Sequence, residues 1–359
     1  MGRRFGATSF TNVEGFRPLP TILEAAGGRS LERVYRAEGV PLNLAFSQNA
    51  WIPLRSLMGL MERSARETSD ELFGLHLGEL MRPEDFGVWA RYALSASNLR
   101  GMIERAIRTL DYFESVSEFR LDVSAELARW SYTIYEPVGF GHRHVADRAL
   151  QPMLTALRYY LGPDWTPTVV ECDYERPLHW RKLEELFGAP ILFSCSTNAL
   201  VFPSCLLSQP SMREPALADR ITFADLRRMS LRLPPRTSVE AAREVIRARI
   251  AEPLDDIEGT AWLLGLSRRT LQRQLSEAGI TYRDLLEQVR LERSLELLTD
   301  SSASITQIAL AVGYSDVTSL SRAFRRRIGE PPSSVRRVPR WTKARQWAAR
   351  VAQFPLGKG

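Results

Sequence analysis

The last third of the chain has apolar side chains spaced three to four residues apart, a period typical of α-helices. Residues 239–250 and 282–298 each place such side chains on one helical face, and the second segment is long enough for more than four turns. Pro331 and Pro332 end the last of these helical patterns, and a short helix follows from Ser333. The pattern predicts an all-α domain over residues 239–340.

The pattern before this region is mixed. Helical spacing alternates with short stretches in which every second side chain is apolar, which is typical of strands. We therefore predict an α+β domain of helices and short strands over residues 21–210. Short helices are expected from residue 21 onward, broken at 27–28 and 39–41. Further helices expected from the spacing are at 53–66, 70–78 (ended by a glycine), 99–110, 146–161 and 180–187. The strands expected are at 118–124, 127–135, 168–173, 190–195 and 199–202.

Three further segments lack such patterns. Residues 1–20 are polar and glycine-rich, so we expect a mobile tail. Residues 211–238 are interrupted by prolines and form a connector, with one helix expected around 216–229. Residues 341–359 form a basic, amphipathic C-terminal tail. No signal peptide or membrane-spanning run is apparent.

One short pattern occurs twice in the all-α region. Residues 261–270 and 309–318 share Ala, Gly, Ser and Thr in the same register. A glycine permits the positive φ of a tight turn, and a serine can cap the helix that follows. Each copy therefore predicts a helix, a turn and a second helix. This is a helix-turn-helix, whose second helix enters the major groove of DNA. We place the two motifs near 257–277 and 305–327.

The charge distribution supports this interpretation. Residues 231–359 contain 22 Lys and Arg against 14 Asp and Glu, whereas residues 1–230 contain 26 against 28. The basic third is the part with the repeated motif, and a basic surface attracts phosphate backbones. The three cysteines (Cys172, Cys195 and Cys205) lack metal-binding or disulfide spacing. They fit a reducing compartment.

The C-terminal half resembles the AraC/XylS family of bacterial transcription activators over roughly 239–338. The residues that carry the resemblance are 266–275, 279–282, Arg290, 305–315, 321–326 and 329–333. Residues 21–210 resemble the arabinose-binding-type effector domain of one branch of that family. The matching segments there are 73–78, 86–87, 98–99, 187–193 and 198–202, followed by 206–207 and Pro210.

The resemblance implies a sequence-specific, DNA-binding transcription regulator, expected to be an activator, under the control of a small-molecule effector. It implies promoter or operator DNA and RNA polymerase as partners, a homodimer formed through the N-terminal domain, and a cytoplasmic, nucleoid-associated location. It does not identify the effector. No cofactor, metal or membrane is expected.

The exposed faces of the second helices give candidate DNA-contacting residues. Arginine can pair with guanine and glutamine with adenine, which makes the first motif the richer in base-reading donors. The candidate base-reading residues are Arg268, Arg269, Gln272 and Arg273 in the first motif, and Asp316, Val317, Thr318, Ser319 and Arg322 in the second. The candidate phosphate-contacting residues are Thr270, Arg325, Arg326 and Arg327.

Aromatic and polar side chains near the expected strand pair are candidates for an effector site, although such aromatics are more often plain core. They are Trp89, Arg91, Tyr92, Trp130, Tyr132, Tyr135 and His142. The His142-Arg143-His144 run has no supporting carboxylate or cysteine, so a metal site is not expected.

Two alternatives remain open from the sequence. One is a DNA-repair methyltransferase fused to this DNA-binding domain, which would need a reactive cysteine. The other is a DNA binder that responds to no effector. No nucleophile elbow, phosphate-binding loop or dinucleotide fingerprint is present. We therefore expect the chain not to be an enzyme.

Overall fold

The chain folds into two compact units, which we describe separately. The first comprises Met1–Glu38 and Leu42–Pro234, and the second comprises Gly39–Pro41 and Pro235–Gly359. The computed structural model describes residues 8–47, 50–115, 117–135, 139, 141–212, 221–229, 233–250 and 256–336. The expected C-terminal tail and residues 213–220 and 230–232 of the connector lie outside these residues. No described helix combines the length and apolarity needed to cross a bilayer.

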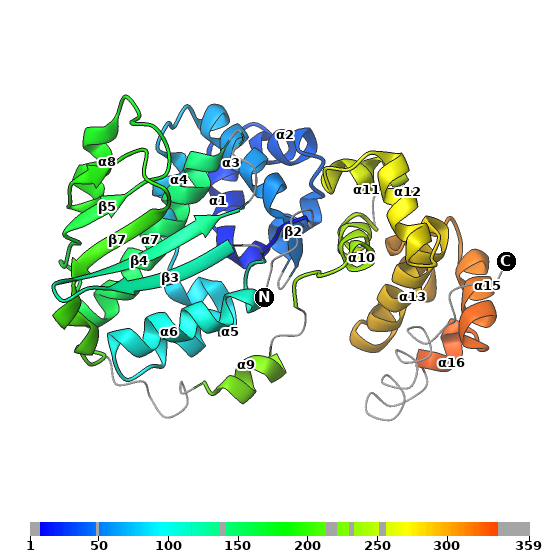
Figure 1. Cartoon of the computed structure of the whole chain (residues 1–359). Coiled ribbons are helices and arrows are strands. Elements are labelled where there is room, and N and C mark those ends of the chain that lie inside the picture. Colours follow the sequence, from blue (N-terminus) through cyan, green and yellow to red (C-terminus); the bar gives the residue numbers. More distant parts are fainter. Residues whose placement is uncertain are drawn as a thin grey trace. The chain divides into compact units, whose positions relative to one another are not determined.

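The first unit contains a five-stranded sheet in the order β3-β4-β7-β5-β6 (Figure 1). Neighbouring strands are antiparallel except for β5 and β6, which are parallel. The bounds are β3 Ser117–Val123, β4 Leu127–Ile134, β5 Val169–Glu171, β6 Ile191–Leu192 and β7 Asn198–Pro203. The sheet confirms the α+β class predicted for this region.

Helices pack against this sheet. Their bounds are α1 Leu19–Ala25, α2 Ser30–Ala37, α3 Leu54–Thr68, α4 Phe73–Leu80, α5 Gly87–Leu94, α6 Leu99–Thr109, α7 His142–Leu161, α8 Trp180–Phe187 and α9 Phe223–Met229. Short 3-10 turns lie at Val13–Phe16, Leu42–Phe46, Pro83–Phe86, Leu110–Tyr112 and Ser204–Ser208. The longest helix, α7, packs on β7 on one side and on α3 and α4 on another.

The expectation of a mobile tail over residues 1–20 is wrong for residues 8–20. Phe10–Asn12 forms strand β1, which pairs with β2 (Trp51–Pro53). Phe10 and Phe16 are almost fully buried. This segment is too short to show periodicity, and its backbone pairs with residues about 40 and 100 positions further along the chain. Residues 1–7 lie outside the described part.

The contact between α4 and α7 depends on two glycines. The expected helix at 70–78 does not end at Gly78 but continues to Leu80, and Gly78 packs against α7. A Cβ at Gly74 would lie 2.1 Å from the carbonyl oxygen of His144, and one at Gly78 would lie 2.8 Å from Cβ of Gln151. The two helices therefore approach each other more closely than side chains at these positions would allow.

A buried polar network lies beside this contact. The Tyr174 hydroxyl donates to the Asp147 carboxylate, and the His142 Nε2 pairs with the Asp173 carboxylate at 3.0 Å. Burial raises the pKa of Asp147 to about 7, and burial lowers the pKa of His144 to about 4. His144 is thus neutral inside the first unit near pH 7, whereas Asp147 is uncharged below pH 7 and about half ionised there, because burying a full charge is costly.

The second unit is helical and matches the predicted all-α class. Its helices are α10 Ser238–Arg249, α11 Ile257–Leu263, α12 Arg268–Glu277, α13 Tyr282–Asp300, α14 Ile305–Ala311, α15 Val317–Ile328 and α16 Pro332–Arg336 (Figure 1). Helix α10 packs against α11, α12 and α13, while α13 also contacts α14, α15 and α16. The long helix thus runs between the two helix pairs.

We predict that Gly74→Ala destabilises the first unit by about 1–3 kcal/mol or more, because the new methyl group has to push α4 away from backbone atoms of α7. The matched control is Gly101→Ala in α6, where the nearest neighbour of a Cβ would be the Asn98 Oδ1 at 3.2 Å. That change should stay within about 1 kcal/mol of wild type. Thermal unfolding of the full chain measures both, and equal stability of the two variants would contradict the close-packing argument.

A second prediction concerns pH. Because the pKa of Asp147 is raised on folding, the carboxyl stabilises the fold below its unfolded pKa, and this contribution is lost as the pH rises through about 7. Asp147→Asn cannot ionise, so its free energy of unfolding relative to wild type should increase between pH 5 and pH 8. The expected gain is on the order of 1–3 kcal/mol. Calorimetry at both pH values tests this, since the effects of His144 cancel between the two proteins. A constant difference would show that Asp147 does not titrate in this range.

Candidate nucleic-acid interface and effector cavity

The two helix pairs of the second unit have the same turn chemistry. In α11 the N–H of Leu266 donates to the carbonyl of Ala261 at 2.8 Å, across Gly265 at φ 71°. In α14 the N–H of Tyr314 donates to the carbonyl of Ala309 at 2.9 Å, across Gly313 at φ 81°. These bonds form a Schellman turn in each copy. The repeated alanine and glycine therefore mark helix ends of identical construction.

The two copies differ immediately after this turn. Ser267 caps α12 by accepting from the N–H of Thr270 at 3.1 Å, as predicted. In the second copy the cap is Asp316, which accepts from the N–H of Ser319 at 2.7 Å. The serine cap expected from the shared register, Ser315, is wrong by one residue. The second turn is one residue longer than the first.

This longer turn changes which positions correspond. Counted from the caps, Arg273 and Arg322 are equivalent, and both are exposed. The buried residues Leu271 and Leu275 likewise correspond to Leu320 and Phe324. Ser321 is then the equivalent of Gln272. Ser321 is half-buried, and alignment on the glycines instead of the caps would shift these correspondences by one.

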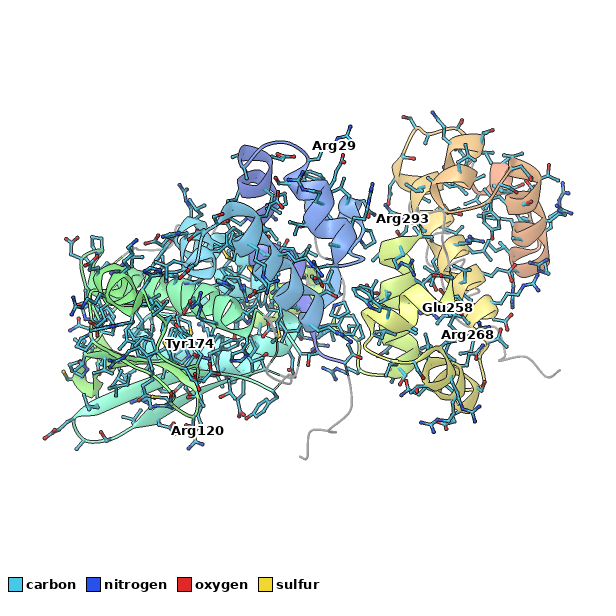
Figure 2. All side chains as sticks on the ribbon, turned by 90° about the horizontal axis from the view of Figure 1, so that it is seen from above. Arg29, Arg120, Tyr174, Glu258, Arg268 and Arg293 are labelled. Atoms are coloured by element: carbon cyan, nitrogen blue, oxygen red, sulfur yellow. The ribbon has the colours of Figure 1, made fainter. Side chains whose placement is uncertain are left out.

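The exposed face of α12 is rich in donors. Arg268, Arg269, Gln272 and Arg273 are all exposed. The Arg268 Nη1 lies 2.7 Å from Oε1 of Glu258, with both side chains more than half exposed (Figure 2). Arg273 faces Glu277 at 3.7 Å. Ion pairs between such exposed groups are weak, so both arginines can exchange these carboxylates for DNA. Thr270 is half-buried, and its hydroxyl lies 2.8 Å from that of Ser267.

The corresponding face of α15 has fewer free donors. Thr318 and Arg322 are exposed, whereas Val317 and Ser319 are half-buried. Asp316 has a structural role, because its carboxylate accepts the Ser319 N–H and hydroxyls of the same turn. The backbone N–H of Ser319 lowers the pKa of Asp316, so the cap stays anionic. A carboxylate committed in this way is a helix cap and not a free base reader.

The three arginines at the end of α15 are not equivalent. Arg327 is only 20% exposed and lies 2.9 Å from Asp284 and 3.1 Å from Glu287, both on α13. Arg326 also pairs with Glu287, although it is largely exposed. Arg325 is exposed. Arg327 therefore anchors α15 to α13, which leaves Arg325 and Arg326 as the better placed phosphate contacts.

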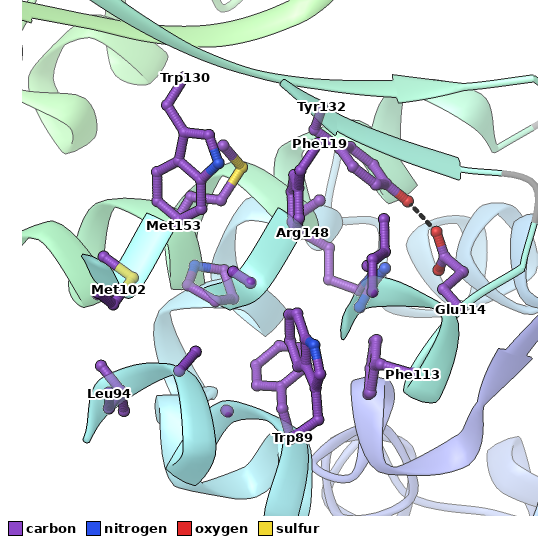
Figure 3. A pocket seen from close by; sticks show the side chains of 18 residues that line it. Trp89, Leu94, Met102, Phe113, Glu114, Phe119, Trp130, Tyr132, Arg148 and Met153 are labelled. Atoms are coloured by element: carbon purple, nitrogen blue, oxygen red, sulfur yellow. Dashed lines mark hydrogen bonds between the residues drawn. The ribbon is translucent and has the colours of Figure 1, made fainter. Parts of the chain in front are cut away.

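The first unit contains a cavity of about 70 Å³ between α5, α6, α7 and the β3–β4 strands (Figure 3). Three of the seven expected effector residues line it, namely Trp89, Trp130 and Tyr132. Trp89 lies on a helix, not on a strand, and stacks against Phe113 with ring centroids 5.1 Å apart. Helix α5 was not predicted because its valine and aromatic side chains favour helix only weakly.

The other four residues lie elsewhere. Tyr92 is buried in a cluster with Ile221 and Leu226 of the α9 segment. Arg91 is exposed, and Tyr135 is exposed with its hydroxyl donating to Glu118 at 2.6 Å. His142 pairs with Asp173 in the buried network. None of these four lines the cavity.

The cavity also contains two buried charged residues that the sequence analysis missed. Glu114 and Arg148 line it and are each 2% exposed. The Tyr132 hydroxyl donates to the Glu114 carboxylate, and burial raises the pKa of Tyr132 well above its usual value. The sequence does contain an indication that Arg148 is buried, because this charged residue interrupts the apolar stripe formed on α7 by Val145, Pro152 and Ala156.

Two of the three cysteines lie where the reactive thiolate is disfavoured. Burial raises the pKa of the Cys172 thiol, which disfavours the reactive thiolate. Burial also raises the pKa of Cys195, the second of the three. His144 accepts from the N–H of Gly74 at 3.3 Å. Among the described residues, no group of three or more His, Cys, Asp or Glu could hold a metal ion.

Comparison with known proteins places both units. Residues 28–211 match the family described as the arabinose-binding domain of the AraC transcription regulator, and residues 261–338 match a helix-turn-helix domain family. The chain is 26% identical over 321 residues to the ornithine utilization regulator of Pseudomonas aeruginosa, covering 88% of this chain and 94% of that protein.

Two further similarities involve the larger part of the chain. It is 25% identical over 332 residues to the transcriptional regulator VirS of Mycobacterium tuberculosis, covering 91% and 95% of the two chains. The crystal structure of the regulator CdpR from Pseudomonas aeruginosa is 22% identical and covers 74% of this chain and 87% of that one, with a TM-score of 0.35. The family match to residues 28–211 spans half of the chain, and the helix-turn-helix match follows it in sequence order. The chain belongs to the AraC family of DNA-binding transcription regulators.

Proposed function

We propose that this regulator is an effector-controlled activator that reads bases mainly through α12. The observation that carries the proposal is the pair of equivalent helices, of which α12 exposes four donor side chains and α15 chiefly Arg322 and Thr318. Arg268, Arg269, Gln272 and Arg273 are the proposed base readers of the first motif, and Thr318 and Arg322 those of the second. Val317 and Ser319 are half-buried and contribute at most through a methyl or hydroxyl contact.

Phosphate contacts would come from Arg325, Arg326 and Thr270. The two motifs lie in one unit and are joined by α13, so both can engage one face of the same duplex. Successive major grooves on one face are about 34 Å apart. A single chain of this kind reads a long, asymmetric site in promoter DNA. As an activator, it would recruit RNA polymerase there, in the cytoplasm and in association with the nucleoid.

Effector control is supported by the way α5 joins the cavity to α9. Trp89 on α5 lines the cavity and also packs beside the Tyr92–Ile221–Leu226 cluster. The Tyr92 and Phe223 rings are 6.1 Å apart, and Ser95 donates to the carbonyl of Ile221 at 3.2 Å. A molecule that moves Trp89 therefore acts on α9, which lies within the connector (residues 211–238) that leads to the second unit. A ligand changes DNA binding only by the difference in its affinity for two states.

The ornithine utilization regulator is named for its role in ornithine use. That name concerns the relative, and we assign no effector to this chain from it. We also propose that two copies of the protein form a homodimer through the first unit. A cavity with buried polar groups favours effector control over an effector-independent DNA binder.

We predict that Arg273→Ala and Arg322→Ala each lower affinity for sites enriched from a random library by the full chain. The loss should be about 1–3 kcal/mol, with a much smaller loss on random DNA, because each removes a base contact. Arg325→Ala should weaken binding to both DNAs alike and reduce the salt dependence. Fluorescence anisotropy at fixed salt measures all three.

The control is Arg283→Ala, which removes the same charge from an exposed position on α13 and should have little effect on site preference. If Arg273→Ala weakened binding to enriched and random DNA equally, the residue would be a phosphate contact. If Arg322→Ala had no effect, the equivalence of the two arginines would carry no function.

A further inference from the structure

The cavity in the first unit has polar groups of an unusual kind. Three buried donors on its wall have no hydrogen-bond partner among the described residues: the indole N–H groups of Trp89 and Trp130, and the Nε of Arg148. Buried donors are nearly always paired in folded proteins, so an unpaired group implies a missing acceptor. All three lack the same thing, which is an oxygen that accepts hydrogen bonds.

Arg148 is the strongest of these groups. Its Nη1 donates to the carbonyl of Gly15 at 2.6 Å, which fixes the guanidinium, while its Nε has no partner. It forms no ion pair with a carboxylate of the described residues. Glu114, on the same side of the cavity, instead accepts the hydroxyl of Tyr132 (Figure 3). A buried guanidinium without a direct counter-charge favours an anion, and its planar fork matches a carboxylate.

The remaining wall is apolar. It consists of aromatic rings, alanines, two leucines, one proline and two methionines, Met102 and Met153. The volume of about 70 Å³ is half of the ~150 Å³ apolar cavity that holds benzene. A short, slender chain fits such a space better than a ring does, and a six-carbon chain fits where the flexible methionines move and lengthen the cavity. A sugar does not fit, because the wall offers too few partners for its hydroxyl groups.

We propose that this cavity binds a slender aliphatic monocarboxylate, with its carboxylate on Arg148 and its chain along Trp89, Trp130 and the two methionines. The effector role of this ligand rests on the proposed function, but its binding does not. The binding site and the effector role can therefore be tested separately.

The first experiment compares head groups on one chain length in the full protein, by calorimetry and by thermal shift. The probes are hexanoate, hexanamide, 1-hexanol and hexylamine at equal ionic strength, with L-arabinose as the sugar. Hexanoate should bind at least tenfold more tightly than the alcohol and the amine, and arabinose should not bind. Affinity should rise roughly fourfold per methylene from butyrate upward, until the chain fills the cavity. Equal or tighter binding of hexylamine would overturn the proposal, because Glu114 would then be the anchor.

Variants locate the site. Arg148→Gln should weaken hexanoate binding at least tenfold and abolish the preference for hexanoate over hexanamide. Because this change also affects the bond to Gly15, a second variant, Ala106→Leu, fills the cavity and leaves Arg148 in place. It should remove binding of every probe while the protein remains folded. Arg120→Gln, an exposed arginine on β3, is the matched control and should bind hexanoate as wild type does. Unchanged binding in Arg148→Gln or in Ala106→Leu would refute the site.

A third measurement tests whether binding of the ligand changes α9 or DNA affinity. Hydrogen exchange of residues 223–229 and DNA affinity are compared with and without saturating hexanoate. Binding accompanied by a change in either supports both the site and effector control. Binding that leaves both unchanged keeps the site and contradicts effector control through α9. Absence of binding refutes this inference alone, because DNA recognition by α12 is tested independently.

Discussion

The close approach of α4 to α7 is the constraint on which most of the first unit depends. Helix α7 packs on the sheet through β7, provides Arg148 to the cavity, and contains His142 and Asp147 of the buried polar network. It can do so only while its other side is sealed at backbone distance by Gly74 and Gly78. A water layer there would expose buried ionisable groups to solvent and return the pKa values of Asp147 and His144 towards their ordinary range. Close helix packing thus sets both the shape and the electrostatics of this unit.

How much the sequence predicted depended on the range of the interactions. Helices and strands with their own periodicity, such as β3, β4, α8 and α13, were predicted to within a few residues. Helix α5 and strand β1 were missed because distant partners, and not local preference, hold them in place. The role of Gly78 was misjudged for the same reason. In the sequence Gly78 resembles a helix end, whereas in the structure its lack of a side chain allows α7 to pack closely against α4.

The candidate sites show the same division. The exposed donors of α12 follow from a local pattern, so their exposure was predicted correctly. The cavity is assembled from segments up to about 70 residues apart, and only three of its seven candidates line it. Aromatic residues alone could not identify it. A charged residue inside an apolar helical stripe, as Arg148 is, would have been the better guide. The prediction of Ser315 instead of Asp316 as the cap of α15 shows a smaller limit. One extra residue in a turn does not change the spacing of apolar residues in the helices on either side of it.

That added residue has a consequence for engineering. Within a helix, one extra residue would rotate everything after it by about 100° and would turn the exposed face into the core. In this protein the extra residue lies in the turn, before the cap, so α12 and α15 keep the same burial pattern. A chimera that moves α12 into the place of α15 therefore has to be joined at Ser267 and Asp316. Joined at the shared glycines instead, the chimera would have a turn of the wrong length, although the two sequences share Ala, Gly, Ser and Thr in the same register. The helix caps, and not the repeated Ala, Gly, Ser and Thr, mark the boundaries of the segment that can be exchanged.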